Sequence, residues 1–165
     1  MTFPIATLDP WDEVFSRREV ALLAEIPSAA VDAAVQGRML SPPGYNAWRG
    51  SPKNLPELAP AYCATIHALK IHLSLSTRKR LVKSLAELQP RDLVGASFEI
   101  EPGVSLDLGH FAYGVAQRAR RYRIYRHARP QTPHPGVTDA DDRDLALIFE
   151  LTHPGAPPAP FDGDR

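Results

Sequence analysis

Apolar residues near the start of the chain recur at the spacing of two short helices. Within each group the residues lie three and four positions apart, so each group makes one apolar helical face. The two groups are Val20, Leu23 and Ala24, and then Val31, Ala34 and Val35. Pro27 separates them, and proline disfavours helical geometry in the residue before it. The pattern predicts two short helices within residues 15–40.

Both predicted helices carry signals for where they begin. Ser16 and Glu19 have the S-x-x-E spacing of a capping box, in which each side chain binds the backbone N–H of the other residue. Ser28 suits the N-cap of the second helix, and Gly37 suits its C-terminal end. Two capped helices joined by a short link are typical of a helix-turn-helix, but a helical pair that only builds a core has the same pattern.

Further helices and one hairpin are predicted downstream. Residues 58–73 and 81–88 carry apolar side chains at helical spacing. Residues 98–108 instead alternate between apolar and polar around a Pro-Gly pair that suits a type II turn. A long helix is expected over about 107–126. The predicted fold class is mainly α, with an N-terminal helix-turn-helix, either plain or winged, followed by further helices and one β-hairpin.

Composition divides the chain into three parts. Residues 1–60 hold the helix-turn-helix and a following loop or wing. Residues 61–129 form a helical region with the β-hairpin, and we expect this region to pack with the first as one unit. Residues 130–165 are Pro-rich and acidic, which predicts a partly disordered tail. The apolar stretch 145–151 in this tail fits either a strand or a helix.

The composition is that of a soluble globular protein. Hydrophobic residues make 44% of the 165 and charged residues 23%. No apolar run approaches the roughly 18 residues needed to span a bilayer. The acidic start, MTFPIATLDPWDE, has no apolar core and predicts neither a signal nor a transit peptide. The single Cys63 fits a buried free thiol, and these features together predict a cytoplasmic protein without a membrane partner.

The net charge is zero, but the charges are unevenly distributed. Residues 1–60 carry five Lys/Arg against seven Asp/Glu, residues 61–130 carry twelve against five, and residues 131–165 carry two against seven. A basic centre beside an acidic tail favours a polyanionic partner for the centre. A solvated surface whose charges balance within the fold is the alternative.

The helix-turn-helix supplies candidate contacts for double-stranded DNA. Its second helix has no Lys or Arg, and Asp32 would repel phosphate, whereas base reading normally uses Arg, Lys, Asn or Gln. The candidates therefore suit positioning on the phosphate backbone better than a strict base code. They are Arg17, Arg18, Ser28, Gln36, Arg38, Arg49 and Lys53.

Two basic runs are candidate contacts for phosphate or for an acidic partner. STRKRLVKSL places cations at a helix start, where each opposes the macrodipole at a cost of roughly 0.3–1 kcal/mol. QRARRYRIYRHAR places them at a helix end, where the macrodipole favours cations, so a solvated helix end is the competing explanation. The candidates are Arg78, Lys79, Arg80, Lys83, Arg118 and Arg121.

Motifs of enzymatic chemistry are missing from the sequence. The six histidines include no H-E-x-x-H motif, one Cys cannot build a Cys-rich zinc site, and neither glycine-rich phosphate motif occurs. The carboxylates within 139–144 lack the Gly and Glu positions of a calcium loop. We therefore expect no enzyme, no catalytic residue, no metal and no cofactor.

Several segments of the chain resemble one family. FSRREVALLAEIPSAAVDAAVQGRML is similar to the MerR-like helix-turn-helix, in which a capped E-V-A-x-L helix precedes a turn and a second helix. With LPELAPAYCATIHAL, LSTRKRLVKSL, FEIEPGVSLDLG and VAQRARRY, it resembles the N-terminal DNA-binding half of VapB-type antitoxins. The resemblance covers about 15–129. It implies a cytoplasmic bacterial protein that binds its own operator as a homodimer and neutralises a protein toxin, a PIN-domain ribonuclease, through a second region.

The sequence departs from this family at two places. Alanines fill much of the second helix, where MerR-like proteins offer basic residues, and no Gly-rich G-G-E-P-V…G-T-R stretch follows residue 129. Toxin binding would then rest on Leu145, Ile148 and Phe149 in the tail, unless these residues pack on the chain's own domain. The expected function is a DNA-binding antitoxin or autorepressor. The alternative is a protein-protein interaction module with a structural helix-turn-helix.

Overall fold

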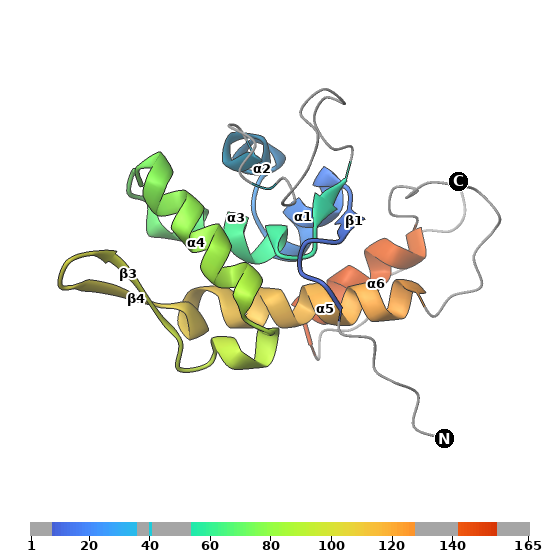
Figure 1. The fold of residues 1–165 in the computed structure, drawn as a ribbon. Coiled ribbons are helices and arrows are strands. Elements are labelled where there is room, and N and C mark those ends of the chain that lie inside the picture. Colours follow the sequence, from blue (N-terminus) through green and yellow to red (C-terminus); the bar gives the residue numbers. More distant parts are fainter. Residues whose placement is uncertain (1–7, 36–39, 41–53, 128–141, 155–165) are drawn as a thin grey trace, which may run out of the picture.

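The computed structural model describes residues 8–35, 40, 54–127 and 142–154. Its α-helices are α1 (Arg17–Ala24), α2 (Ser28–Val35), α3 (Ala59–Leu69), α4 (Leu75–Glu87), α5 (Gly114–His127) and α6 (Asp142–Thr152). Its strands are β1 (Glu13–Phe15), β2 (Leu55–Pro56), β3 (Ser97–Glu101) and β4 (Val104–Asp107). A 3-10 turn (Pro90–Leu93) and a π-helical turn (Gly109–Tyr113) complete the described elements. The predicted mainly α fold class is confirmed (Figure 1).

The helical pair α1–α2 forms where the sequence predicts it. The capping box is complete, because Glu19 N donates to Ser16 Oγ at 3.2 Å and Ser16 N donates to Glu19 Oε1 at 3.0 Å. Helix α1 ends at Ala24, and its C-cap residue Glu25 turns the chain with a left-handed backbone (φ 56°). The three residues 25–27 then lead into α2, and both helices contact α3.

The pairing of β1 with β2 is a feature that the hydrophobic pattern did not predict. The two strands are antiparallel, and the N–H of Glu57 donates to the carbonyl of Asp12 at 3.1 Å. Asp12 precedes β1 and Glu57 follows β2, so the pairing brings together two carboxylates that lie far apart in the sequence. Most of the predicted loop or wing, residues 41–53, lies outside the described residues, and residues 54–60 pair with β1 and then begin α3.

The predicted hairpin is confirmed as β3 and β4. Gly103 has φ 83°, the left-handed conformation that the third position of a type II turn requires. Phe98 and Leu106 pair across the two strands and are buried, whereas Val104 near the tip is exposed. Figure 1 shows the hairpin projecting away from the helices, beyond α4.

Helix α5 lies at the centre of the packing. Ala119 and Tyr122 are fully buried, and α5 contacts α1, α3 and α6. The ring of Tyr122 lies 5.7 Å, centroid to centroid, from that of Phe15, next to β1 and α1. Residues from both predicted parts, 1–60 and 61–129, therefore build one shared core.

The apolar stretch of the tail is a helix that packs on the body. Helix α6 contacts α1 and α5 and lies beside the C-terminal half of α5 (Figure 1). Ile148 is buried in the chain's own core, which agrees with the alternative that these residues pack on the chain's own domain. Leu145 is half-buried, and Phe149 is partly exposed and stacks on His153. Within the described ranges, no helix is long and apolar enough to cross a membrane.

Candidate functional site

The outer face of the α1–α2 pair carries the described part of the predicted DNA contacts. Arg17, Arg18 and Ser28 are all exposed. Arg17 Nη1 lies 2.6 Å from Asp32 Oδ1, so this ion pair joins the two helices and neutralises the carboxylate that would repel phosphate. Arg18 makes no such ion pair with any described residue. The pair of helices thus offers one compensated and one uncompensated cation.

The remaining predicted DNA contacts lie beyond the described residues. These are Gln36, Arg38, Arg49 and Lys53. Within its described length, α2 exposes alanines and Asp32 and carries no cation, as the sequence already indicates. Direct readout of bases by α2 itself is therefore limited to what Ser28 and Asp32 can reach.

The basic residues of α4 fall into two groups. Lys79 and Lys83 are exposed and have no ion pair among the described residues. Arg80 binds strand β3 of the hairpin, because its guanidinium donates to the carbonyls of Glu99 and Ile100 at 3.1 Å each. The same guanidinium lies 5.4 Å from the centroid of the Phe98 ring, a cation–π contact. Lys79 and Lys83 are available to a partner, whereas Arg80 is committed to the fold.

Arg78 is half-buried at the start of α4. Its Nε donates to the buried hydroxyl of Tyr62 at 3.2 Å. Burial raises the pKa of Tyr62, and the hydrogen bond from Arg78 opposes part of that rise. No carboxylate pairs with Arg78 in the part of the chain that the structure describes.

Most arginines of the basic run on α5 bind carboxylates within the molecule. Arg120 Nε and Arg123 Nη1 both donate to the carboxylate of Glu57, which is only 5% exposed. Arg123 also donates to Asp12 on the neighbouring segment. Burial lowers the pKa of Arg123, but its hydrogen bonds and attraction to Glu57 and Asp12 outweigh that effect and raise it. This cluster therefore ties α5 to the β1–β2 pair.

A second buried cluster surrounds Glu19. Its Oε2 accepts from the hydroxyl of Tyr122 and, at 2.5 Å, from Arg126 Nη1. Burial raises the pKa of Tyr122, and the hydrogen bond to Glu19 raises it further. Asp144 on α6 is also buried and contributes in the same direction. The capping-box glutamate thus joins α1 and α5 near α6.

The two candidate contacts on α5 differ in accessibility. Arg118 Nη2 donates to the carbonyl of Leu23 at 2.9 Å and lies 3.7 Å from Glu25 Oε2, so it closes the end of α1. Arg121 is exposed and remains available to a partner. Helix α5 is therefore mainly a structural element.

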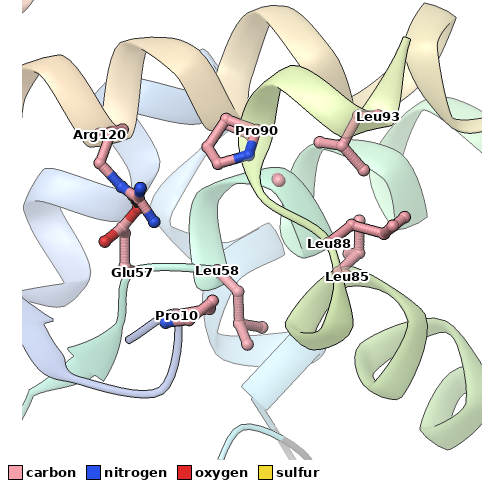
Figure 2. A pocket seen from close by; sticks show the side chains of 10 residues that line it. Pro10, Glu57, Leu58, Leu85, Leu88, Pro90, Leu93 and Arg120 are labelled. Carbon is pink, nitrogen blue, oxygen red and sulfur yellow. Dashed lines mark hydrogen bonds and ion pairs between the residues drawn. The ribbon is translucent and has the colours of Figure 1, made fainter. Parts of the chain in front are cut away.

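A small cavity lies beside the Glu57–Arg120 pair. Figure 2 shows these two side chains meeting at one side and Leu85, Leu88, Pro90 and Leu93 around the other. Its volume is about 20 Å³, enough for one water molecule, which needs about 10–15 Å³. The cavity has no room for a substrate.

A larger hollow, the α2–α3 cleft, opens between α2 and the link from α3 to α4. Its volume is about 390 Å³. Its apolar walls are Ala30, Ala33, Ala34, Ile66, Ile71 and Leu73. Arg78, His67, His72 and Cys63, which is 1% exposed, also line it. Burial raises the pKa of Cys63 to about 12, so the thiol is protonated at neutral pH and is a poor nucleophile.

Comparison with protein-family models, with curated proteins and with solved structures gave no match. The described residues include no group of three or more His, Cys, Asp or Glu placed to hold a metal ion.

Sequence reasoning missed the buried carboxylates Glu19 and Glu57 as organising residues. Glu19 carried a signal, because the capping box placed it beside the backbone of α1, but nothing in that spacing indicated Tyr122 or Arg126. Glu57 carried no local signal, since its partner arginines lie 63 and 66 residues away in the sequence.

Proposed function

We propose that this protein is a non-enzymatic, DNA-binding regulator of the antitoxin type, which binds its own operator through the α1–α2 pair and a protein partner through a separate surface. The observation that carries the DNA-binding part is the helical pair itself. The first helix begins with a complete capping box, and the two helices, joined by residues 25–27 and in contact with α3, expose Arg17, Arg18 and Ser28.

The proposed contact with DNA is made mainly to the phosphate backbone. Arg18 is exposed and has no ion-pair partner among the described residues. Arg17 pairs with Asp32, so the negative charge of the Asp32 carboxylate is compensated where phosphate would approach. Such contacts fix the orientation of a protein on the duplex but carry little sequence information. Selectivity for an operator would come from Ser28, Gln36, Arg38 and the residues that follow, acting in a homodimer.

A second candidate function is a protein-protein interaction module in which the helical pair is structural. The alanines of α2 favour it, because Ala30, Ala33 and Ala34 line the α2–α3 cleft. Under this alternative the protein would bind its partner without binding DNA.

Binding to DNA from the protein's own upstream region, compared with scrambled DNA across a salt series, tests the proposal. We expect selective binding with a steep salt dependence. The double variant Arg18→Ala, Arg38→Ala should weaken binding and reduce the salt slope by about 0.9 for each phosphate that the variant no longer neutralises.

Arg91→Ala is the matched control, since Arg91 is exposed outside the helical pair. Its salt slope should equal that of the wild type. Weak, equal binding to both DNAs, or a slope unchanged by the double variant, would overturn DNA binding by α1–α2 and favour the interaction module.

A further inference from the structure

The α2–α3 cleft combines an apolar wall with a cation that the fold leaves without a counter-charge. Its apolar side comes from the alanines of α2 together with Ile66, Ile71 and Leu73. Arg78 lines the same hollow, and its Nε donates to Tyr62. Both Nη atoms of Arg78 are without a hydrogen bond or an ion pair to any described residue. One edge of its guanidinium can therefore bind a carboxylate from outside.

The charged side chains on the α3–α4 side of this cleft are of one sign, whereas Asp32 on α2 lies outside its lining and pairs with Arg17. Residues 58–86, which include α3 and most of α4, contain Lys70, Arg78, Lys79, Arg80 and Lys83 but no Asp or Glu. Lys70 and Lys79 are exposed near the link between the helices. In α5, by contrast, buried carboxylates compensate the arginines. Charge complementarity therefore favours an acidic occupant for the cleft.

Exposed apolar side chains also lie at the α3–α4 link, where Ile71 lines the hollow and Leu75 is outside its lining. Ile71 and Leu75 are 55% and 52% exposed, and both lie in or beside the α3–α4 link. A small acid held by Arg78 would leave Leu75 and the surrounding lysines uncovered. A segment of another protein can cover apolar side chains and several cations at once, so the extent of this surface favours a macromolecular occupant.

From these observations we propose that the α2–α3 cleft docks an acidic, amphipathic segment of a protein partner. An apolar side chain of that segment would lie against Ala30, Ala33 and Leu73, while a carboxylate binds Arg78. The inference rests on the partner-binding half of the proposed function and is independent of DNA binding.

Selection of short random peptides displayed on phage, against the full chain, tests the proposal. We expect enriched peptides to combine Asp or Glu with large apolar residues. Their synthetic versions should bind the wild type in calorimetric titration and show a strong dependence on salt. Failure to enrich any peptide, or enrichment of peptides without acidic residues, would overturn the proposal.

Two pairs of matched variants locate the binding site. Ala33→Trp fills the cleft from an exposed position, whereas Ala29→Trp adds the same side chain to α2 at an exposed position outside the cleft. Arg78→Gln removes the facing cation, whereas Arg91→Gln removes an exposed one elsewhere. Ala33→Trp and Arg78→Gln should weaken peptide binding about tenfold or more, which is about 1.4 kcal/mol, and the controls should leave it unchanged.

Equal binding by wild type and Ala33→Trp would show that the peptides bind elsewhere and would overturn the cleft as the docking site. Titration with N-acetyl-leucine and N-acetyl-glutamate tests whether the cleft instead binds a small acid. If these small acids bind as tightly as the peptides, the occupant of the cleft is a small ligand and the proposal of a protein segment is overturned. Because DNA binding is measured separately, its loss would leave this result intact.

Discussion

Helices α4 and α5 both carry runs of basic residues, but the fold uses the two runs in opposite ways. On α5, Arg120, Arg123 and Arg126 bind the buried carboxylates Glu57 and Glu19. On α4, Lys79 and Lys83 point to solvent without a described ion-pair partner. The number of cations in a run therefore does not tell how many are available to a nucleic acid or an acidic protein.

The difference arises from what each helix packs against. Helix α5 contacts α1, whose capping box places Glu19 in the core, and its arginines bind Asp12 and Glu57 at the ends of the β1–β2 pair. A buried carboxylate is costly unless it is paired and hydrogen-bonded, so arginines are needed there. Helix α4 contacts α3 and β3, which bring no buried carboxylate to it, so its Lys79 and Lys83 stay on the surface.

The largest effect should follow from Glu57→Gln. The substitution leaves Arg120 and Arg123 without their shared carboxylate in a buried site. Breaking such a pair typically costs about 3–5 kcal/mol of the free energy of unfolding, which urea denaturation would measure. Glu101→Gln, at an exposed position in the hairpin, is the control and should change little. If Glu57→Gln lowers the free energy of unfolding no more than Glu101→Gln does, the α5 cluster does not stabilise the fold.

Tyr122→Phe should have the next largest effect. It removes the hydroxyl that donates to Glu19, and a hydrogen bond to a charged group contributes about 1.5–3 kcal/mol. Tyr125→Phe is the matched control, because Tyr125 is exposed on the same helix.

Tyr122→Phe should also change how the free energy of unfolding depends on pH above pH 10. The pKa of Tyr122 is raised above its usual value of 10.0 in the folded protein. The contribution of Tyr122 to the free energy of unfolding is therefore fully present below pH 10. It is lost as the pH rises through the pKa of the folded protein, because this tyrosine ionises at lower pH in the unfolded chain. The decline in the free energy of unfolding above pH 10 should be shallower in Tyr122→Phe than in the wild type. Identical slopes would contradict the assignment.

The Arg17–Asp32 pair should contribute much less. Both side chains are about half exposed, and exposed ion pairs typically contribute about 0.2–1 kcal/mol. A double-mutant cycle with Arg17→Ala and Asp32→Ala, measured by urea denaturation, should give a coupling energy in that range, smaller at high salt. A coupling of several kcal/mol would remove the contrast between this surface pair and the buried clusters of α5.

Lys83→Gln should have the smallest effect on folding. Substitutions at exposed positions without specific contacts usually change the free energy of unfolding by less than about 0.5 kcal/mol. Thermal unfolding of this variant should match the wild type. A marked loss of stability would show that α4 uses its charge inside the fold after all.

The sequence predicted the local elements well, because their signals act over a few residues. The capping box, the end of α1 before Pro27 and the Gly103 turn each depend on neighbours within about one turn of chain. The candidate site was predicted only in part. Arg17, Arg18, Lys79 and Lys83 are exposed and their contacts stay predictions, whereas Arg118 donates to the backbone of α1.

The sequence by itself therefore determined the helical pair, the hairpin, the mainly α class and the acid-free basic stretch of residues 58–86. Tertiary structure alone decided that α5 is a core helix, that α6 packs on it, and that the alanines of α2 line a cleft with Arg78. The physical reason is the distance along the sequence between the residues that determine each feature. A helix or turn is specified by contacts between close neighbours, whereas the burial of a charge depends on a partner such as Glu57, more than 60 residues from Arg120 and Arg123.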